Sequence, residues 1–215
     1  MQQYQKDFID FLVNSGALSF GDYTTKSGRK TPYFINTGKF DEGGKISALG
    51  KFYADHIMKS GLDKADIIFG PAYKGIPLCV ATASAMAGMG KNVGFSFNRK
   101  EAKDHGDAGI VVGKKIKDGD KVLLVEDVIT AGTTMREIVP FLRSLAAVEI
   151  LGVVVSVDRK EKGTGDLSAV QEVEKNYNLK VYPVVTIADI LERLGPRITA
   201  DQLAAAGEYL KKYGI

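Results

Sequence analysis

The chain has 215 residues, of which 45% are hydrophobic and 26% are charged. This is the composition of an ordinary globular protein, so it excludes a disordered chain, a collagen and a coiled coil. The formal net charge of +3 is too small to indicate nucleic-acid binding without a clustered basic patch, and we expect no nucleic-acid partner.

The first third of the chain is predicted to contain two helices. Apolar residues recur at helical spacing from Tyr4 to Leu12 and again from Ile46 to Ile57. His56 is offset from the second apolar face, which predicts a surface histidine. The chain begins without the apolar core of a signal peptide, and no apolar run approaches the ~18 residues of a membrane span. We therefore expect a cytoplasmic protein that does not contact a membrane.

Short β-branched runs alternate with helical segments in the rest of the chain. They predict strands at residues 66–69, 93–97, 122–125, 150–157 and 181–185. Such alternation is typical of the α/β class, with a central, mostly parallel sheet and helices on both faces. The run from Val122 to Val125 is apolar throughout, so we expect it at the centre of the sheet.

The last segment and the domain organisation follow from local signals. A Thr-x-x-Gln capping box at Thr199 predicts a terminal helix with Leu203 and Leu210 on one face. The sequence contains no internal repeat and no linker. We therefore expect a single domain over residues 1–215, in which residues 1–65 form a small N-terminal subdomain.

The segment from Gly70 to Gly75 follows the first predicted strand. It has the glycine spacing of a P-loop, but Ile76 stands where the lysine is required, so it is not a Walker A motif. Its backbone amides and Lys74 could bind a highly charged group such as diphosphate, or they could form an ordinary turn with a surface lysine. The single cysteine, Cys79, lies just beyond, and its apolar neighbours predict a buried, unreactive thiol.

The segment from Asn98 to Gly109 is polar and carries cations at positions 99, 100, 103 and 105. One interpretation is a mobile surface loop without a ligand. The other is a lid whose cations close over a polyphosphate and exclude water. The residues alone leave both open.

The most informative stretch runs from Val122 to Thr134. Glu126 and Asp127 follow the predicted central strand, where open α/β sheets bind ligands, and paired carboxylates suit ribose hydroxyls or a hydrated Mg2+. A helix then begins near Gly132, where free amides and threonine hydroxyls suit a phosphate monoester. A sugar phosphate would fit both halves. The alternative is a helix cap and a turn that bind nothing.

Together these segments resemble the type I phosphoribosyltransferases, and more specifically the orotate phosphoribosyltransferases. The first resemblance rests on the acidic pair with the loop Thr-Ala-Gly-Thr-Thr at residues 130–134. The second rests on residues 26–34 (KSGRKTPYF), 69–77 (FGPAYKGIP), 97–106 (FNRKEAKDHG) and 158–159 (DR). The lid sequence is the most specific of these landmarks. The resemblance implies the type I phosphoribosyltransferase fold.

The resemblance also implies a role for individual residues. The implied binding site for 5-phosphoribosyl 1-pyrophosphate consists of Lys26, Tyr73, Lys74, Arg99, Lys100, Lys103, His105, Glu126, Asp127, Val128, Ile129, Thr130, Ala131, Gly132, Thr133 and Thr134. The implied catalytic residues are Lys100, Lys103 and Asp127, and orotate is implied at Phe34, Ile35, Thr130 and Arg159. Two positions depart from the family: Glu126 stands where aspartate is common, and Ile35 stands where phenylalanine is frequent.

The implied reaction transfers ribose 5-phosphate from this donor to N1 of orotate, giving orotidine 5′-phosphate and pyrophosphate in de novo pyrimidine synthesis. The implied cofactor is Mg2+, held mainly by the donor's diphosphate and water because no protein carboxylate cage is visible. In the family the lid enters the neighbouring subunit's site, which implies a homodimer with shared active sites. A non-catalytic sensor of the donor and a phosphoribosyltransferase for another base remain alternatives.

Overall fold

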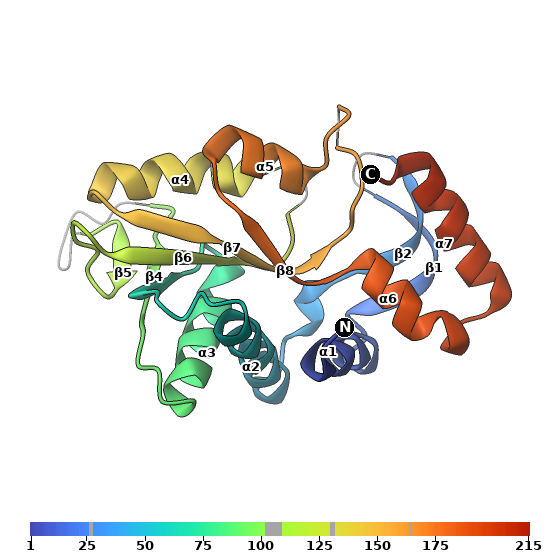
Figure 1. Cartoon of the computed structure of the whole chain (residues 1–215), viewed down its shortest axis with the longest axis horizontal. Coiled ribbons are helices and arrows are strands. Elements are labelled where there is room, and N and C mark those ends of the chain that lie inside the picture. The colour runs from blue at the N-terminus through green and yellow to red at the C-terminus, as the bar shows by residue number, and fades with distance from the viewer. Residues whose placement is uncertain (26–27, 102–108, 130–131, 164) are drawn as a thin grey trace.

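The computed structural model describes residues 1–25, 28–101, 109–129, 132–163 and 165–215 (Figure 1). Several residues of the implied site lie outside these described ranges: Lys26, Lys103, His105, Thr130 and Ala131. In the described ranges, no helix is both long enough and apolar enough to cross a membrane.

The elements alternate between strands and helices along most of the chain. The helices are α1 (Gln3–Asn14), α2 (Gly43–Lys59), α3 (Gly75–Gly88), α4 (Thr133–Leu145), α5 (Ala169–Tyr177), α6 (Ile187–Leu194) and α7 (Ala200–Tyr213), with short 3-10 helices η1 (Thr37–Lys39) and η2 (Gly195–Arg197). The strands are β1 (Leu18–Thr24), β2 (Lys30–Ile35), β3 (Ile67–Phe69), β4 (Gly94–Asn98), β5 (Val111–Gly113), β6 (Lys121–Glu126), β7 (Glu149–Asp158) and β8 (Val181–Thr186).

The main sheet confirms the predicted class. Its order is β5-β4-β3-β6-β7-β8, with parallel pairing from β4 to β8 and an antiparallel edge strand β5. All five predicted strands form its parallel part. Strands β1 and β2 form a separate antiparallel pair and, like β5, were not predicted, because their runs are short or mix polar with apolar residues.

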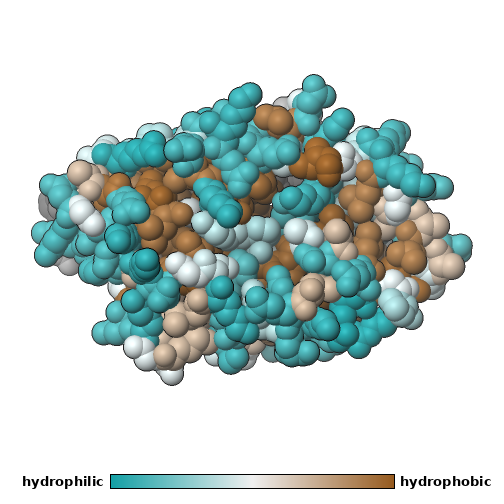
Figure 2. All heavy atoms as spheres, in the orientation of Figure 1, coloured by the Kyte–Doolittle hydropathy of each residue, from teal (hydrophilic) through white to brown (hydrophobic). Residues whose placement is uncertain are grey.

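Strand β6 lies inside the sheet, between β3 and β7, as its composition predicted. Side chains on a strand point alternately to opposite faces. Val122 and Leu124 pack with α4 and α5, whereas Leu123 and Val125 pack with α2 and α3. Figure 1 shows these helix pairs on opposite faces, and in Figure 2 apolar side chains gather over β6 and β7. The strand is therefore buried on both faces.

The N-terminal elements continue this core. Helix α1 packs on α2, where the rings of Phe8 and Phe52 are 5.2 Å apart. The prediction that His56 lies on the surface is wrong: it is only 7% exposed, and its Nδ1 is 2.9 Å from the Tyr4 hydroxyl. Helix α1 covers that side of α2, which the pattern of α2 alone could not reveal. The boundary of the N-terminal subdomain at residue 65 stays a prediction.

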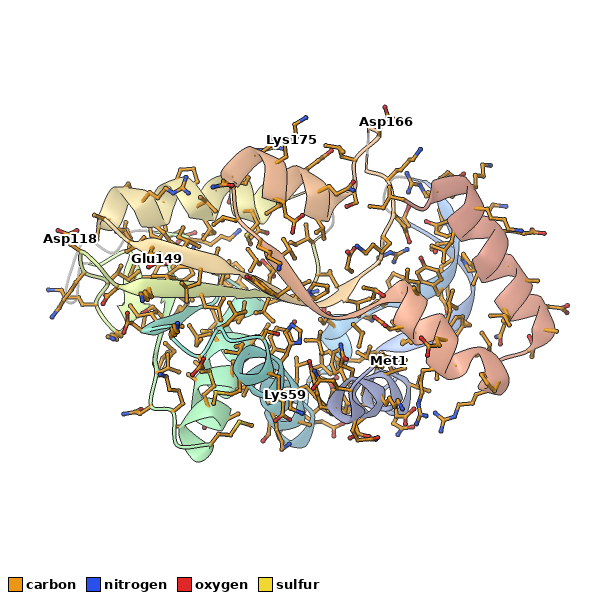
Figure 3. The ribbon with its side chains drawn as sticks, in the orientation of Figure 1. Met1, Lys59, Asp118, Glu149, Asp166 and Lys175 are labelled. Atoms are coloured by element: carbon orange, nitrogen blue, oxygen red, sulfur yellow. The ribbon has the colours of Figure 1, made fainter. Side chains whose placement is uncertain are left out.

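Other local predictions have mixed outcomes. Cys79 is a buried free thiol, as predicted. Thr199 caps α7 through the expected capping box, but Ala206 and Tyr209 are the buried residues of this helix, while Leu203 is exposed. In Figure 3 the labelled side chains of Asp166, in a loop, and Lys175, in the last turn of α5, point away from the body of the molecule. The interior contains the two apolar clusters and a few buried polar residues.

Candidate active site

Two groups of polar residues lie where strands of the main sheet end. We call the first the acidic-pair region; it comprises Thr37, Lys74, Glu126, Asp127 and the start of α4 at Gly132. We call the second the Arg159 cluster; it comprises Tyr33, Arg159, Glu161 and Tyr209. The parallel pairing of β6 with β7 brings both to one edge of the sheet. The Ser156 amide and hydroxyl donate to the carbonyl oxygen of Asp127, at 3.0 and 2.5 Å.

Hydrogen bonds to the Glu126 backbone and to the Asp127 side chain hold the acidic pair in place. The hydroxyl of Tyr53 in α2 donates to the Glu126 carbonyl at 2.7 Å, and the Val128 amide donates to Asp127 Oδ1 at 2.8 Å. Burial and the neighbouring Asp127 carboxylate raise the pKa of Glu126 to about 8. Burial alone would raise the pKa of Asp127 as well, but hydrogen bonds, led by that from Thr37, lower it. At pH 7 the pair therefore combines a neutral carboxyl group, Glu126, with an ionised one, Asp127.

Lys74 and Thr37 meet the ionised carboxylate. Lys74 Nζ is 3.0 Å from Asp127 Oδ2 and donates to Thr37 Oγ1 at 3.1 Å. The loop that carries Lys74 is tight: a Cβ at Gly70 would lie 1.9 Å from the Gly75 carbonyl oxygen, so only glycine fits. The Lys74 side chain is 62% exposed, which leaves it free to meet a charged ligand.

The start of α4 is where the sequence predicts a phosphate cradle, and this role stays a prediction. Gly132 has φ of 65°, a left-handed conformation that favours glycine, immediately before the first residue of the helix. A cavity of about 50 Å³ opens beside it; it is lined by Glu126, Val128, Ile129, Gly132, Thr133, Thr134 and Met135. Helix amides and threonine hydroxyls around a small cavity suit a phosphate group.

In the segment from Asn98 to Gly109, the described residues next to β4 lie beside the loop that carries Lys74. The Ala72 amide donates to Asn98 Oδ1 at 2.9 Å, which ties the end of β3 to the end of β4. Lys100 Nζ lies 5.7 Å from the centroid of the Tyr73 ring, and Tyr73 is exposed. The Arg99 side chain is half-buried, and its Nε has no hydrogen-bond partner in the described ranges. Three residues implied to bind the donor, Tyr73, Arg99 and Lys100, therefore lie on neighbouring loops.

The Arg159 cluster is centred on a carboxylate that the sequence did not single out. Glu161 Oε1 accepts from Tyr33 at 2.5 Å and from Arg159 Nε at 2.9 Å, and Oε2 accepts from Tyr209 at 2.8 Å. The Arg159 guanidinium also lies over the Tyr33 ring, 4.8 Å from its centroid. Every member of this cluster is held by another member.

Two further residues implied to bind orotate lie next to this cluster in strand β2. Phe34 is 38% exposed and stacks on Tyr23 with centroids 5.4 Å apart, whereas Ile35 is half-buried. Sequence reasoning missed Thr37, Tyr53, Glu161 and Tyr209. The one signal in the sequence was that Glu161 stands two residues after Arg159.

The chemistry of the site narrows the class of protein to which the chain can belong. A small cavity at the start of a helix, next to an acidic pair at the carboxyl end of a central strand and with Lys74 on the adjoining loop, is the arrangement expected of a type I phosphoribosyltransferase. Residues 37–185 match the family described as "Phosphoribosyl transferase domain".

Full-length relatives refine this class. The orotate phosphoribosyltransferase of Clostridium beijerinckii is 46% identical, with 100% of this chain and 99% of the relative covered. That of Lachnoclostridium phytofermentans is 48% identical, with the same coverage. The crystal structure of orotate phosphoribosyltransferase from Francisella tularensis superposes with a TM-score of 0.88 at 37% identity, covering 97% of this chain and 100% of that one. The chain belongs to the orotate phosphoribosyltransferase family.

Proposed function

We propose that the chain transfers ribose 5-phosphate from 5-phosphoribosyl 1-pyrophosphate to N1 of orotate, releasing pyrophosphate and forming orotidine 5′-phosphate for pyrimidine synthesis. One observation carries the proposal: the acidic-pair region and the Arg159 cluster lie at neighbouring strand ends. The Ser156 contact to Asp127 ties strand β7 to the acidic-pair region, and Arg159 follows three residues later. A donor sugar at the first and a carboxylated base at the second would then be adjacent.

The proposed division of roles follows from the charges. As the bond between C1′ and the diphosphate oxygen breaks, C1′ becomes cation-like and negative charge builds on the leaving group. Lys74, Lys100 and Lys103 bind that leaving group, and Tyr73, Arg99, His105 and Lys26 complete its surroundings. Asp127 and Glu126 anchor the ribose hydroxyls close to the developing positive charge, while residues 128–134 hold the 5-phosphate. No covalent nucleophile is required, because N1 of orotate attacks C1′ itself.

The acceptor base is proposed to bind at Phe34, Ile35, Thr130 and Arg159. The Arg159 guanidinium donates from Nε to Glu161 and from Nη2 to Thr31 Oγ1, the second at 3.3 Å. Arginine has five donors, so the Nη1 side can still pair with the orotate carboxylate.

The proposed cofactor is Mg2+, and the donor set around the acidic pair fits a metal held by substrate. Asp127 already accepts from Val128, Thr37 and Lys74, and Glu126 is buried and neutral at pH 7. Mg2+ prefers several oxygen ligands and keeps waters, so the diphosphate is its natural ligand here. When bound, it offsets charge on the leaving group.

The test follows orotate absorbance with each component left out. We expect consumption of orotate only when the donor and Mg2+ are both present, and none with uracil or a purine base in its place. Full activity in excess chelator would contradict the role of Mg2+. Equal turnover of a base without a carboxylate would contradict the acceptor assignment.

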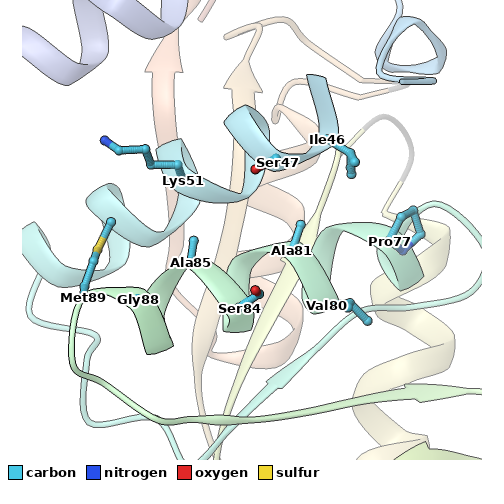
Figure 4. Close-up of a pocket in the computed structure, with 10 residues that line it drawn as sticks. All are labelled: Ile46, Ser47, Lys51, Pro77, Val80, Ala81, Ser84, Ala85, Gly88 and Met89. Carbon is cyan, nitrogen blue, oxygen red and sulfur yellow. The ribbon is translucent and has the colours of Figure 1, made fainter. Parts of the chain in front are cut away.

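We also propose a homodimer with shared sites. Helices α2 and α3 enclose a groove of about 690 Å³, lined by Ile46, Ser47, Lys51, Pro77, Val80, Ala81, Ser84, Ala85, Gly88 and Met89 (Figure 4). Val80 and Met89 are exposed, as is Phe95 in the following strand. Exposed apolar side chains close together favour burial against a partner. A second copy on this face would add its own lid to the neighbouring site.

Mixed dimers test the shared site. Lys103→Ala removes a lid group and Asp127→Ala removes an anchor, so each variant should be nearly inactive. If the lid acts across the two-fold axis, about half of the reassembled dimers are mixed, and each contains one intact site. Activity should return to about a quarter of the wild-type value. If subunits exchange and activity does not return, the lid acts within its own chain.

Two broader proposals complete this assignment. We propose a cytoplasmic location, supported by the biosynthetic role. We also propose that residues 1–215 act as one domain, with residues 1–65 as its N-terminal subdomain. The apolar cluster that runs from Tyr4 and Phe8 to Val125 and Val154 supports a continuous unit.

A further inference from the structure

Thr37 joins the two halves of the proposed site. It opens η1 directly after strand β2, two residues beyond Ile35. Asn36 caps this turn by accepting from the Gly38 amide at 3.0 Å. The turn directs Thr37 toward Asp127, which is 90 residues away in the sequence.

The contacts of Thr37 fix the direction of its hydrogen bonds. Its Oγ1 is 2.5 Å from Asp127 Oδ2 and 3.1 Å from Lys74 Nζ. A lysine ammonium has no acceptor, so Lys74 must donate to the Thr37 hydroxyl. Thr37 then donates its single proton to Asp127, which is ionised and can only accept. The Val128 amide holds the other carboxylate oxygen, so both oxygens are occupied.

The two partners of Asp127 Oδ2 differ in how freely they can leave. The Lys74 side chain is 62% exposed and flexible, and an ion pair of that kind contributes little to stability. Thr37 is short and half-buried, and the neighbouring turn fixes its backbone. Lys74 can therefore exchange Asp127 for the diphosphate, whereas Thr37 stays.

We propose that Thr37 is a positioning residue for the transfer reaction, holding the Asp127 carboxylate oriented toward the ribose hydroxyls while Lys74 turns to the diphosphate. This inference rests on the proposed function, because it takes Asp127 as a ribose anchor. Without the Thr37 hydroxyl, departure of Lys74 would remove both of these donors from Oδ2, and the carboxylate would be held less firmly about χ2. A less ordered anchor binds the donor sugar less tightly.

The experiment compares Thr37→Val with Thr37→Ser. Valine keeps the shape and removes the hydroxyl, while serine keeps the hydroxyl. We expect Thr37→Val to raise the Kd and KM for 5-phosphoribosyl 1-pyrophosphate about tenfold, the loss typical of a hydrogen bond to a charged group. The KM for orotate should change less than about twofold, and Thr37→Ser should restore donor binding. Melting temperatures of all variants show whether each one is folded.

Asp127→Asn separates this inference from the proposed function. If Asp127→Asn binds the donor like the wild type, the anchor role of Asp127 is wrong, and so is the inference. If Asp127→Asn loses donor binding while Thr37→Val binds normally, only the inference on Thr37 is overturned. The double variant should bind the donor no more weakly than Asp127→Asn alone. An additional tenfold loss there, or an equal rise in the KM for orotate, would show that Thr37 acts elsewhere and would overturn the proposal.

Discussion

The acidic-pair region and the Arg159 cluster satisfy their charges in different ways. In the Arg159 cluster, Glu161 accepts from three side chains of the protein, and the side chains of Arg159 and Glu161 are only 19% and 12% exposed. In the acidic-pair region, Asp127 is held partly by Lys74, an exposed side chain. The carboxylate of the first arrangement is satisfied within the protein, whereas Lys74 in the second is exposed enough to exchange its partner. If the first binds the acceptor and the second binds the donor, as proposed, this contrast suits a donor with a large, highly charged leaving group.

The largest expected effect tests the completeness of the Arg159 cluster. Glu161→Gln keeps the shape but leaves the Arg159 guanidinium without its carboxylate partner. Removing one partner of a buried ion pair costs about 3–5 kcal/mol, so we expect the free energy of unfolding to fall by about that amount. We also expect the KM for orotate to rise more than that for the donor, because Arg159 loses its orientation. Urea unfolding and steady-state kinetics measure the two effects.

Tyr209→Phe is the matched control, since it removes one hydrogen bond and leaves the ion pair intact. It should cost about 1 kcal/mol. If Glu161→Gln is no less stable than Tyr209→Phe, the cluster does not depend on its charges, and the contrast between the two regions fails.

The second prediction concerns the neutral carboxyl group of the acidic-pair region. The pKa of Glu126 is about 8 in the folded chain against 4.5 as its ordinary value. Between these values the folded state binds more protons than the unfolded state, so stability falls as pH rises. From pH 6.5 to 8.5 this amounts to roughly 2 kcal/mol, and Glu126→Gln should remove it. Urea unfolding of both proteins at pH 6.5 and 8.5 measures the difference.

This pH window avoids another buried group with a large pKa shift, His56. Burial lowers the pKa of His56 to about 4, so its effect on stability is confined to pH values below its ordinary pKa of 6.5. Parallel slopes for wild type and Glu126→Gln between pH 6.5 and 8.5 would mean that Glu126 is already ionised in the folded chain.

The sequence predicted the framework of the fold because the framework depends on local patterns. Apolar β-branched runs identified the parallel strands, and the uninterrupted run at Val122–Val125 identified the buried one. The same patterns gave no signal for β5, which has three residues and pairs at the edge. His56 was misplaced because α1, a distant segment, buries it.

The site residues also divide into those that local sequence patterns predict and those that only the folded chain brings together. The acidic pair and the glycine before α4 stand together in the sequence, so their chemistry could be predicted from it. The groups that hold them come from far away: Tyr53 is 73 residues from Glu126, and Tyr209 is 48 residues from Glu161. Only the folded chain brings such pairs together. Supporting residues were therefore the ones that sequence reasoning missed.

The smallest expected effect separates a glycine that the site requires from one that it does not. Gly132 has φ of 65°, and an added Cβ would lie 3.4 Å from Val173 Cγ2. Gly207 lies within helix α7, and a Cβ added there would meet no atom of the described ranges within 4 Å beyond its chain neighbours and the backbone of its own helix.

An alanine at Gly132 must adopt a left-handed conformation, which costs about 1–2 kcal/mol. An alanine within a helix instead gains about 0.5–1 kcal/mol over glycine. We therefore expect Gly132→Ala to lower the melting temperature and Gly207→Ala to raise it. Gly132→Ala should also weaken donor binding, because the start of α4 is the proposed phosphate cradle, while Gly207→Ala should leave it unchanged. If both substitutions shift the melting temperature in the same direction, the left-handed turn before α4 is not the reason for glycine there, and the acidic-pair region is less constrained at this turn than its geometry indicates.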